Sequence, residues 1–211
     1  MSSVIGFLMK RKDSQKRGMM KFKKSITNEE IKKLPRKVFD GDIFLIDNQK
    51  KLDIAIPLLK KYDKLGFDTE AKPSFKKGKV NKTALLQFAT NDKAFLFRLN
   101  HIGFPDELVN ILSDNSILKI GVAIKDDLRD LKKAKPFKPG NFIDLQDLAQ
   151  DLDIQNTGLK KLSAIVLEGR ISKSQRLSNW ENNILTPAQL QYAATDAWIC
   201  YELYNKLTES N

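Results

Sequence analysis

Hydrophobic and polar residues alternate along most of the chain in patterns that predict both strands and helices. Short apolar runs bounded by polar residues predict strands over 43–46, 65–70, 84–89, 94–99 and 117–122, the first of them buried and the third and fourth paired as a hairpin. Helical spacing predicts helices over about 49–61, 105–113, 126–134, 144–151, 159–168 and 187–207. Strands interleaved with helices, followed by a helical C-terminal half, predict an α/β fold in which helices flank a mixed sheet.

Two of the predicted helices begin with a capping-box pattern. Thr27 and Glu30 have the spacing of a capping box, so a short helix is predicted to begin there. Thr186 and Gln189 repeat that spacing before the last helix, with Pro187 at its first helical position.

The amino-acid composition limits the kinds of catalytic and metal-binding site that the chain can form. The 211 residues are 41% apolar, which is enough for one sizeable core and leaves little room for two domains. The single cysteine, Cys200, excludes a disulfide framework, and with the single histidine, His101, it argues against zinc sites and against serine or cysteine triads. Apolar runs are too short for a membrane span or a signal peptide. We therefore expect a cytoplasmic protein whose chemistry rests on carboxylates, tyrosine, lysine and arginine.

The net charge of +11 is concentrated at the N-terminus, where residues 1–37 carry +9. We therefore divide the chain into a basic N-terminal extension, residues 1–37, and a domain over residues 38–211. The extension suits contact with nucleic-acid phosphates, and it equally suits a solubilising leader.

Asp68 and Glu70 stand two apart on a predicted strand, so their side chains leave the same face of the sheet. Two carboxylates at a strand end suit Mg²⁺ or Mn²⁺. Taken alone, the pair is also compatible with a solvated strand end or with a two-carboxylate glycosidase.

Two more acidic positions lie on predicted helices. Asp127 follows a strand at a helix start and shares an apolar stripe with Leu131, whereas its neighbour Asp126 lies on a polar stripe. An acid at a helix start also serves as an ordinary cap. Tyr192 and Asp196 are one turn apart on the last helix, where apolar neighbours make an unpaired charge costly.

In chain order these residues resemble the motifs of the DEDDy family of 3′–5′ exonucleases. Further stretches of the same kind are Leu85 to Thr90 on a predicted strand, Ser178-Asn179-Trp180 before the last helix, and the loop over 69–78. The resemblance covers about residues 43–207 and is closest to the Werner-type branch and its stand-alone bacterial relatives.

This resemblance implies a ribonuclease H-like fold and two divalent cations, Mg²⁺ or Mn²⁺. The implied catalytic residues are Asp68, Glu70, Asp127, Tyr192 and Asp196. Asp68, Glu70 and Asp196 would hold the first cation. Asp68 and Asp127 would serve the second. Tyr192 would position the attacking water, because an ordinary tyrosine pKa of about 10 makes it a poor base.

Basic residues flank these motifs and are expected to bind phosphates; they are Lys72, Lys76, Lys77, Lys173 and Arg176. The alternative is an ordinary lysine-rich solvated surface. Trp180 and Cys200 are expected in the core.

The function implied is a metal-dependent 3′–5′ exonuclease that removes 5′-mononucleotides from DNA. The preference for DNA rests on the Werner-type resemblance. A ribonuclease D-like 3′–5′ exoribonuclease is the nearest alternative, and a catalytically inactive nucleic-acid-binding module is another. The expected partner is nucleic acid, and the sequence indicates neither a membrane nor an obligate protein partner.

Overall fold

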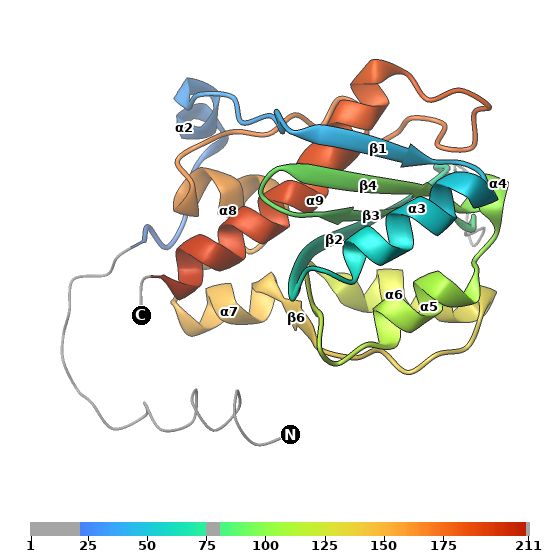
Figure 1. Ribbon diagram of the computed structural model, residues 1–211. Coiled ribbons are helices and arrows are strands. Elements are labelled where there is room, and N and C mark those ends of the chain that lie inside the picture. The colour runs from blue at the N-terminus through green and yellow to red at the C-terminus, as the bar shows by residue number, and fades with distance from the viewer. Residues whose placement is uncertain (1–21, 75–80, 210–211) are drawn as a thin grey trace.

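The computed structural model describes residues 22–74 and 81–209, which form a mixed sheet with helices on both faces (Figure 1). The strands of this part of the chain are β1 (Asp42–Ile46), β2 (Lys64–Ala71), β3 (Thr83–Ala89), β4 (Lys93–Arg98), β5 (Leu118–Gly121) and β6 (Phe142–Asp144). Their order across the sheet is β1-β4-β3-β2-β5-β6. The strand β3 runs antiparallel to both of its neighbours, and the other pairs are parallel.

The helices of the described residues are α2 (Asn28–Lys33), α3 (Gln49–Leu59), α4 (Leu99–Ile102), α5 (Asp106–Ser113), α6 (Ile124–Ala134), α7 (Leu145–Asp151), α8 (Leu159–Val166) and α9 (Pro187–Thr208). Both predicted capping boxes are present, at α2 and at α9. None of these helices combines the length and the apolar character that crossing a bilayer requires.

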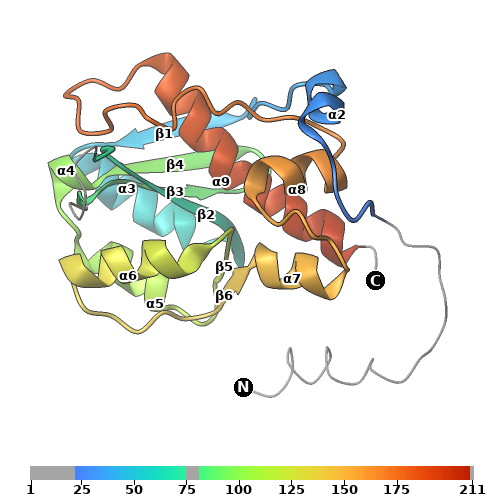
Figure 2. The same ribbon diagram turned by 180° about the vertical axis from the view of Figure 1, so that it is seen from behind.

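The two faces of the sheet bury different helices (Figures 1 and 2). Helices α3, α5 and α6 pack on the face that carries Phe67, Leu86 and Phe88. The long helix α9 crosses the opposite face, where it contacts β1 to β5 and packs against α7 and α8. Successive side chains of a strand therefore pack against opposite helix layers, and every second side chain of β2 faces α9.

The predicted α/β architecture with a helical C-terminal half is confirmed, with differences in two strands. The strand β1 was predicted to be buried, but it forms one edge of the sheet, and Phe44 is 37% exposed. The strand β6 was not predicted, because its three residues are too few to show a periodic pattern. Trp180 and Cys200 are buried as expected.

Residues 22–37, which the sequence analysis assigned to the N-terminal extension, pack against the domain in this structure. Ile26 and Ile31 are buried in the cluster that includes α8 and α9. The backbone of Lys37 donates to the carbonyl of Arg170 at 2.9 Å, and Arg170 donates in turn to the carbonyl of Pro35. The chain thus enters β1 along the loop that precedes α9.

One glycine allows α9 to lie directly on β2. A Cβ atom on Gly66 would stand 2.0 Å from the carbonyl oxygen of Ala197, so only a residue without a side chain fits at this crossing. Asp68 follows two residues later on the same face of β2, and Asp196 precedes Ala197 on α9. The close crossing therefore brings an acidic residue of each element together.

Candidate active site

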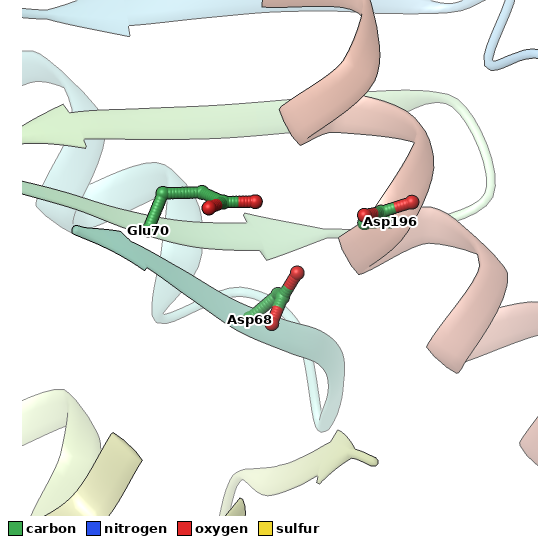
Figure 3. Close-up of side chains that lie close together, drawn as sticks. All are labelled: Asp68, Glu70 and Asp196. Atoms are coloured by element: carbon green, nitrogen blue, oxygen red, sulfur yellow. The ribbon is translucent and has the colours of Figure 1, made fainter. Parts of the chain in front are cut away.

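Three carboxylates converge between the sheet and α9 (Figure 3). Asp68 and Glu70 extend from β2, and Asp196 extends toward them from α9. One oxygen of each carboxylate lies within 4.8 Å of the others. Asp68 and Glu70 are half-buried, whereas Asp196 is only 6% exposed. This spacing is short enough for one cation to contact all three side chains.

Asp127 lies beside this group but is not one of its three members. It stands in the first turn of α6, is half-buried, and accepts a hydrogen bond from the hydroxyl of Thr69. Thr69 separates Asp68 from Glu70 along β2, so its side chain leaves the other face of the strand. Asp126 is exposed and forms an ion pair with Arg129 at 2.7 Å.

The start of α6 is fixed from β6 by Asp144. Its carboxylate accepts hydrogen bonds from the backbone of Ala123 at 3.0 Å and of Ile124 at 3.1 Å. Ala123 has a φ of 58°, in the left-handed region, which turns the chain from β5 into the helix. Asp144 therefore sets the helical phase that directs Asp127 toward Thr69.

Burial raises the pKa values of the four acidic side chains, and neighbouring carboxylates of the site raise those of Asp68 and Glu70 as well. Burial, and then the neighbouring Asp196 and Asp127 carboxylates, together raise the pKa of Glu70 to about 9. Burial and the other three carboxylates also raise the pKa of Asp68 well above its ordinary value. Burial raises the pKa of Asp127 to about 6, against the opposing effect of its hydrogen bond from Thr69. In the metal-free protein Glu70 therefore holds a proton at neutral pH, and a bound cation would displace it.

Tyr192 lies one turn before Asp196 on α9 and completes the group. Burial raises the pKa of Asp196 to about 7, while the nearby Tyr192 hydroxyl and the Lys173 ammonium lower it. Burial, then the Asp196 and Glu70 carboxylates, raise the pKa of Tyr192 above its ordinary value. Tyr192 therefore keeps its proton at neutral pH and is available as a hydrogen-bond donor.

A divalent cation fits the side chains that meet here. Oxygen Oδ1 of Asp196 is buried without a hydrogen-bond partner in the described residues, which is costly unless a ligand compensates it. The donors are carboxylate oxygens alone, and hard oxygen donors suit Mg²⁺ and Mn²⁺ better than zinc. Asp68, Glu70 and Asp196 are thus the residues that could hold a cation.

The predicted phosphate-binding residues differ in how far the structure relates them to this site. Lys173 is exposed and close enough to Asp196 to affect its pKa, and Arg176 is exposed in the same loop. Lys72 follows β2 and forms an ion pair with Glu181 at 3.5 Å. The predicted residues Lys76 and Lys77 lie outside the described part of the chain.

Sequence reasoning missed three residues that shape the site. Thr69 donates to Asp127, Asp144 fixes the start of α6, and Gln87 of β3 stands directly across from Asp68. The spacing of Thr69 between two acids offered a weak signal. Neither Gln87 nor Asp144 could be assigned without strand register and the pairing of β5 with β6.

Comparison with known proteins assigns a chemistry to this arrangement. A family model described as a 3′–5′ exonuclease matches residues 43–210. The chain is 37% identical over 151 residues to the mouse bifunctional 3′–5′ exonuclease/ATP-dependent helicase WRN, covering 69% of this chain and 11% of WRN. It is 32% identical over 151 residues to a 3′–5′ exonuclease of Arabidopsis thaliana, covering 69% of this chain and 52% of that protein. The chain thus spans at most about half the length of these two relatives.

Solved structures show the same fold. The EXO domain of Aedes aegypti Nibbler superposes with a TM-score of 0.75 at 24% identity, over 82% of this chain and 91% of that one. Escherichia coli RNase D, an exoribonuclease, superposes with a TM-score of 0.72 at 23% identity, over 80% of this chain and 44% of that one. The ribonuclease H-like fold expected from the sequence is therefore confirmed.

Proposed function

Because the chain belongs to the DEDD-type family of 3′–5′ exonucleases, we propose that it hydrolyses the 3′-terminal phosphodiester bond of DNA and releases 5′-mononucleotides. The observation that carries this proposal is the convergence of Asp68, Glu70 and Asp196, with Tyr192 one helical turn away. A catalytically inactive binding module would have no need of a buried Asp68 carboxyl whose pKa three neighbouring carboxylates raise further.

We propose that two divalent cations, Mg²⁺ or Mn²⁺, bind at this site. Asp68, Glu70 and Asp196 would hold one, and Asp68 with Asp127 would hold the other. Bound there, the cations would neutralise charge on the phosphodiester and lower the pKa of a coordinated water. A second cation near Asp127 is supported by that carboxylate's contribution to the pKa values of Asp68 and Glu70.

The protein's own groups orient the reactants. Tyr192, which keeps its proton at neutral pH, would donate a hydrogen bond and so fix the attacking water in line with the scissile bond. Thr69 holds the Asp127 carboxylate by donating to it. Asp196 is buried, so close packing restricts the orientations that its carboxylate can take.

Cationic side chains beside the site would bind the phosphates of the strand. A cavity of about 90 Å³ is lined by Arg36 and Lys37 from the segment before β1 and by Tyr192 and Asp196 from α9. Lys173 stands near the same Asp196 carboxylate. Since phosphate contacts position a nucleic acid without reading its sequence, these cations fit substrate binding of low sequence specificity.

The choice of DNA over RNA is supported by the 37% identity to the exonuclease and helicase WRN. RNA remains the second candidate substrate. RNA differs from DNA by its 2′-hydroxyl, and we assign no residue of the described site to binding that group.

Hydrolysis of matched DNA and RNA oligonucleotides labelled at the 5′ end tests both parts of the proposal. With Mg²⁺ or Mn²⁺, we expect a ladder of labelled DNA products that shortens one nucleotide at a time, with slower shortening of RNA. Faster shortening of RNA would overturn the assignment of substrate. Release of the label itself as a mononucleotide would overturn the 3′–5′ polarity. The variant Asp68→Asn is the matched control for a contaminating nuclease.

A further inference from the structure

Gln87 of β3 is a fully buried polar residue that the proposed chemistry does not use. Its relative exposure is 0%, and neither Oε1 nor Nε2 has a hydrogen-bond partner among the described residues. Buried side-chain amides are nearly always paired, because leaving them unpaired forfeits their hydrogen bonds to water. An amide with both ends unpaired therefore still has a donor and an acceptor to offer to a bound ligand or to a reoriented side chain.

The strand register places this amide beside the carboxylate cluster. Gln87 is the direct partner of Asp68 in the antiparallel pairing of β2 with β3, so both side chains leave the same face. Side chains at such opposed positions have Cβ atoms roughly 4.5–5.5 Å apart. On its other side, Gln87 faces Leu96 of β4, which offers no polar group.

The neighbours of Gln87 on β3 pack under the part of α9 that carries Tyr192 and Asp196. Leu85, two residues before Gln87 on the same face, packs in the cluster of Tyr192 and Ala193. Ala89, two residues after it, packs in the cluster of Ala194 and Ala197. Gln87 thus lies under the turn of α9 that carries Asp196, whose Oδ1 is itself buried and unpaired. Both unpaired groups therefore neighbour Asp68, Gln87 through the strand register and Asp196 through the carboxylate cluster.

We propose that Gln87 is a positioning residue of the metal site, whose Nε2 donates a hydrogen bond to the Asp68 carboxylate when a divalent cation is bound. This inference rests on the proposed function. Asp68 is the ligand proposed to serve both cations, so its orientation matters most. A neutral amide suits this task because it donates to a carboxylate without adding a fifth negative charge to the cluster and without competing as an anionic ligand.

Binding of Mn²⁺ to the variant Gln87→Met, measured by titration calorimetry on the full chain, tests this role. Methionine has a similar length and no hydrogen-bond donor. We expect the Kd for Mn²⁺ to rise by about 10–100-fold, as is typical when a group that orients a metal ligand is removed. The Tm in EDTA should stay the same or rise, because an unpaired buried amide is replaced by an apolar side chain. If Gln87 had a merely structural role, the Kd for Mn²⁺ would stay the same and the Tm in EDTA would fall.

Two further variants make the outcome decisive. Leu86→Met changes the neighbouring side chain on the opposite face of β3 and should leave the Kd for Mn²⁺ unchanged. Gln87→Leu provides a second apolar replacement and should weaken Mn²⁺ binding as Gln87→Met does.

An unchanged Kd in the Gln87 variants, or their failure to fold while Leu86→Met folds, would overturn the positioning role. A wild-type protein that binds no Mn²⁺ would instead overturn the proposed function.

Discussion

Two adjacent carboxylates at the start of α6 show how much one helical position changes a residue. Asp127 accepts from Thr69 and has a pKa raised to about 6 by burial, whereas Asp126 is exposed and pairs with Arg129. The buried Leu131, one turn after Asp127, fixes the face that α6 turns toward the sheet. Only one of the two neighbours can therefore take part in the chemistry.

Replacing each of these residues separately tests the assignment. Asp127→Ala should lower turnover by orders of magnitude with little change in nucleic-acid affinity, because it removes a group that acts at the reacting phosphate. Asp126→Ala removes an exposed i,i+3 ion pair and should cost at most about 1 kcal/mol of stability. Single-turnover rates and binding curves for both variants measure the difference. Loss of turnover in Asp126→Ala with activity retained in Asp127→Ala would contradict the assignment.

The raised pKa values make a prediction about stability and pH. The folded protein keeps protons on Asp196 up to a pKa of about 7 and on Glu70 up to about 9, whereas the unfolded chain loses them near pH 4. Between those limits the unfolded state binds fewer protons, so the free energy of unfolding falls as pH rises. In EDTA, the Tm should therefore decline from pH 5 to pH 9.

The variant Asp196→Asn isolates one of the groups responsible. It should unfold at a higher temperature than the wild type at pH 8 in EDTA, by about 2–4 °C for each kcal/mol of repulsion and desolvation removed. Its Tm should fall less between pH 5 and pH 7. Thermal melts at fixed ionic strength measure both effects. A wild-type Tm that rises over this range, or an Asp196→Asn variant less stable than wild type at pH 8, would refute the account.

The sequence was enough to select some residues of the site and not others. Helical phase and i,i+4 spacing were enough to select Asp127 over Asp126 and to pair Tyr192 with Asp196. Ala134 continues the stripe of Asp127 and Leu131 but is exposed, because α6 ends there. Gln87 could not be selected, since its role depends on the register between β2 and β3.

At the scale of elements, the site depends on how closely α9 approaches β2. Gly66 provides this approach, since any side chain there would collide with the backbone of Ala197. A backbone carbonyl in a helix cannot move aside without displacing the helix. The distance between Asp68 and Asp196 is therefore set by a glycine that takes no part in the chemistry.

The variant Gly66→Ala tests this dependence. Forcing the two elements apart should cost about 1–3 kcal/mol of stability and should lower the affinity for Mn²⁺. Gly158→Ala is the matched control, because its added methyl group meets no atom within 4 Å, and its effect should stay within about 1 kcal/mol. Denaturant unfolding and Mn²⁺ titration measure the two effects. Equal stability and equal Mn²⁺ affinity in the two variants would rule out the proposed dependence.

Elements with a local sequence signal were predictable, and features that depend on pairing with distant strands were not. The helices α3, α5 and α9 and the β3–β4 hairpin follow from periodicity and capping, which are local properties. The three-residue β6 and the place of β1 at the sheet edge depend on pairing with distant strands. Asp144, the last residue of β6, fixes α6 for the same non-local reason.

On the scale of the whole molecule, positive charge is concentrated before the domain. Residues 1–21, which precede the described structure, carry a net charge of +5. Residues 22–37 pack on the domain and bring Arg36 and Lys37 to the cavity beside Asp196. Residues 22–37 of the basic extension are therefore fixed on the domain beside the site, whereas residues 1–21 lie outside the described part of the chain.

Deleting residues 1–21 should weaken nucleic-acid binding and reduce the dependence of the Kd on salt, because fewer counterions are released. Ile26, which is buried, is retained, so the domain should keep its Tm. The single-turnover rate at saturating nucleic acid should change little. Binding measured at several salt concentrations gives the slope. A slope equal to that of the full chain would make the segment a passive leader.

The central claim is that the carboxylates between β2 and α9 hydrolyse nucleic acid with bound divalent cations. The most direct measurement is the initial rate of mononucleotide release by wild type and Asp68→Asn, in EDTA and after Mn²⁺ is added back in excess. We predict no release by either protein in EDTA, and recovery with Mn²⁺ in the wild type alone. Undiminished release by the wild type in EDTA, or full recovery of Asp68→Asn with Mn²⁺, would contradict the claim.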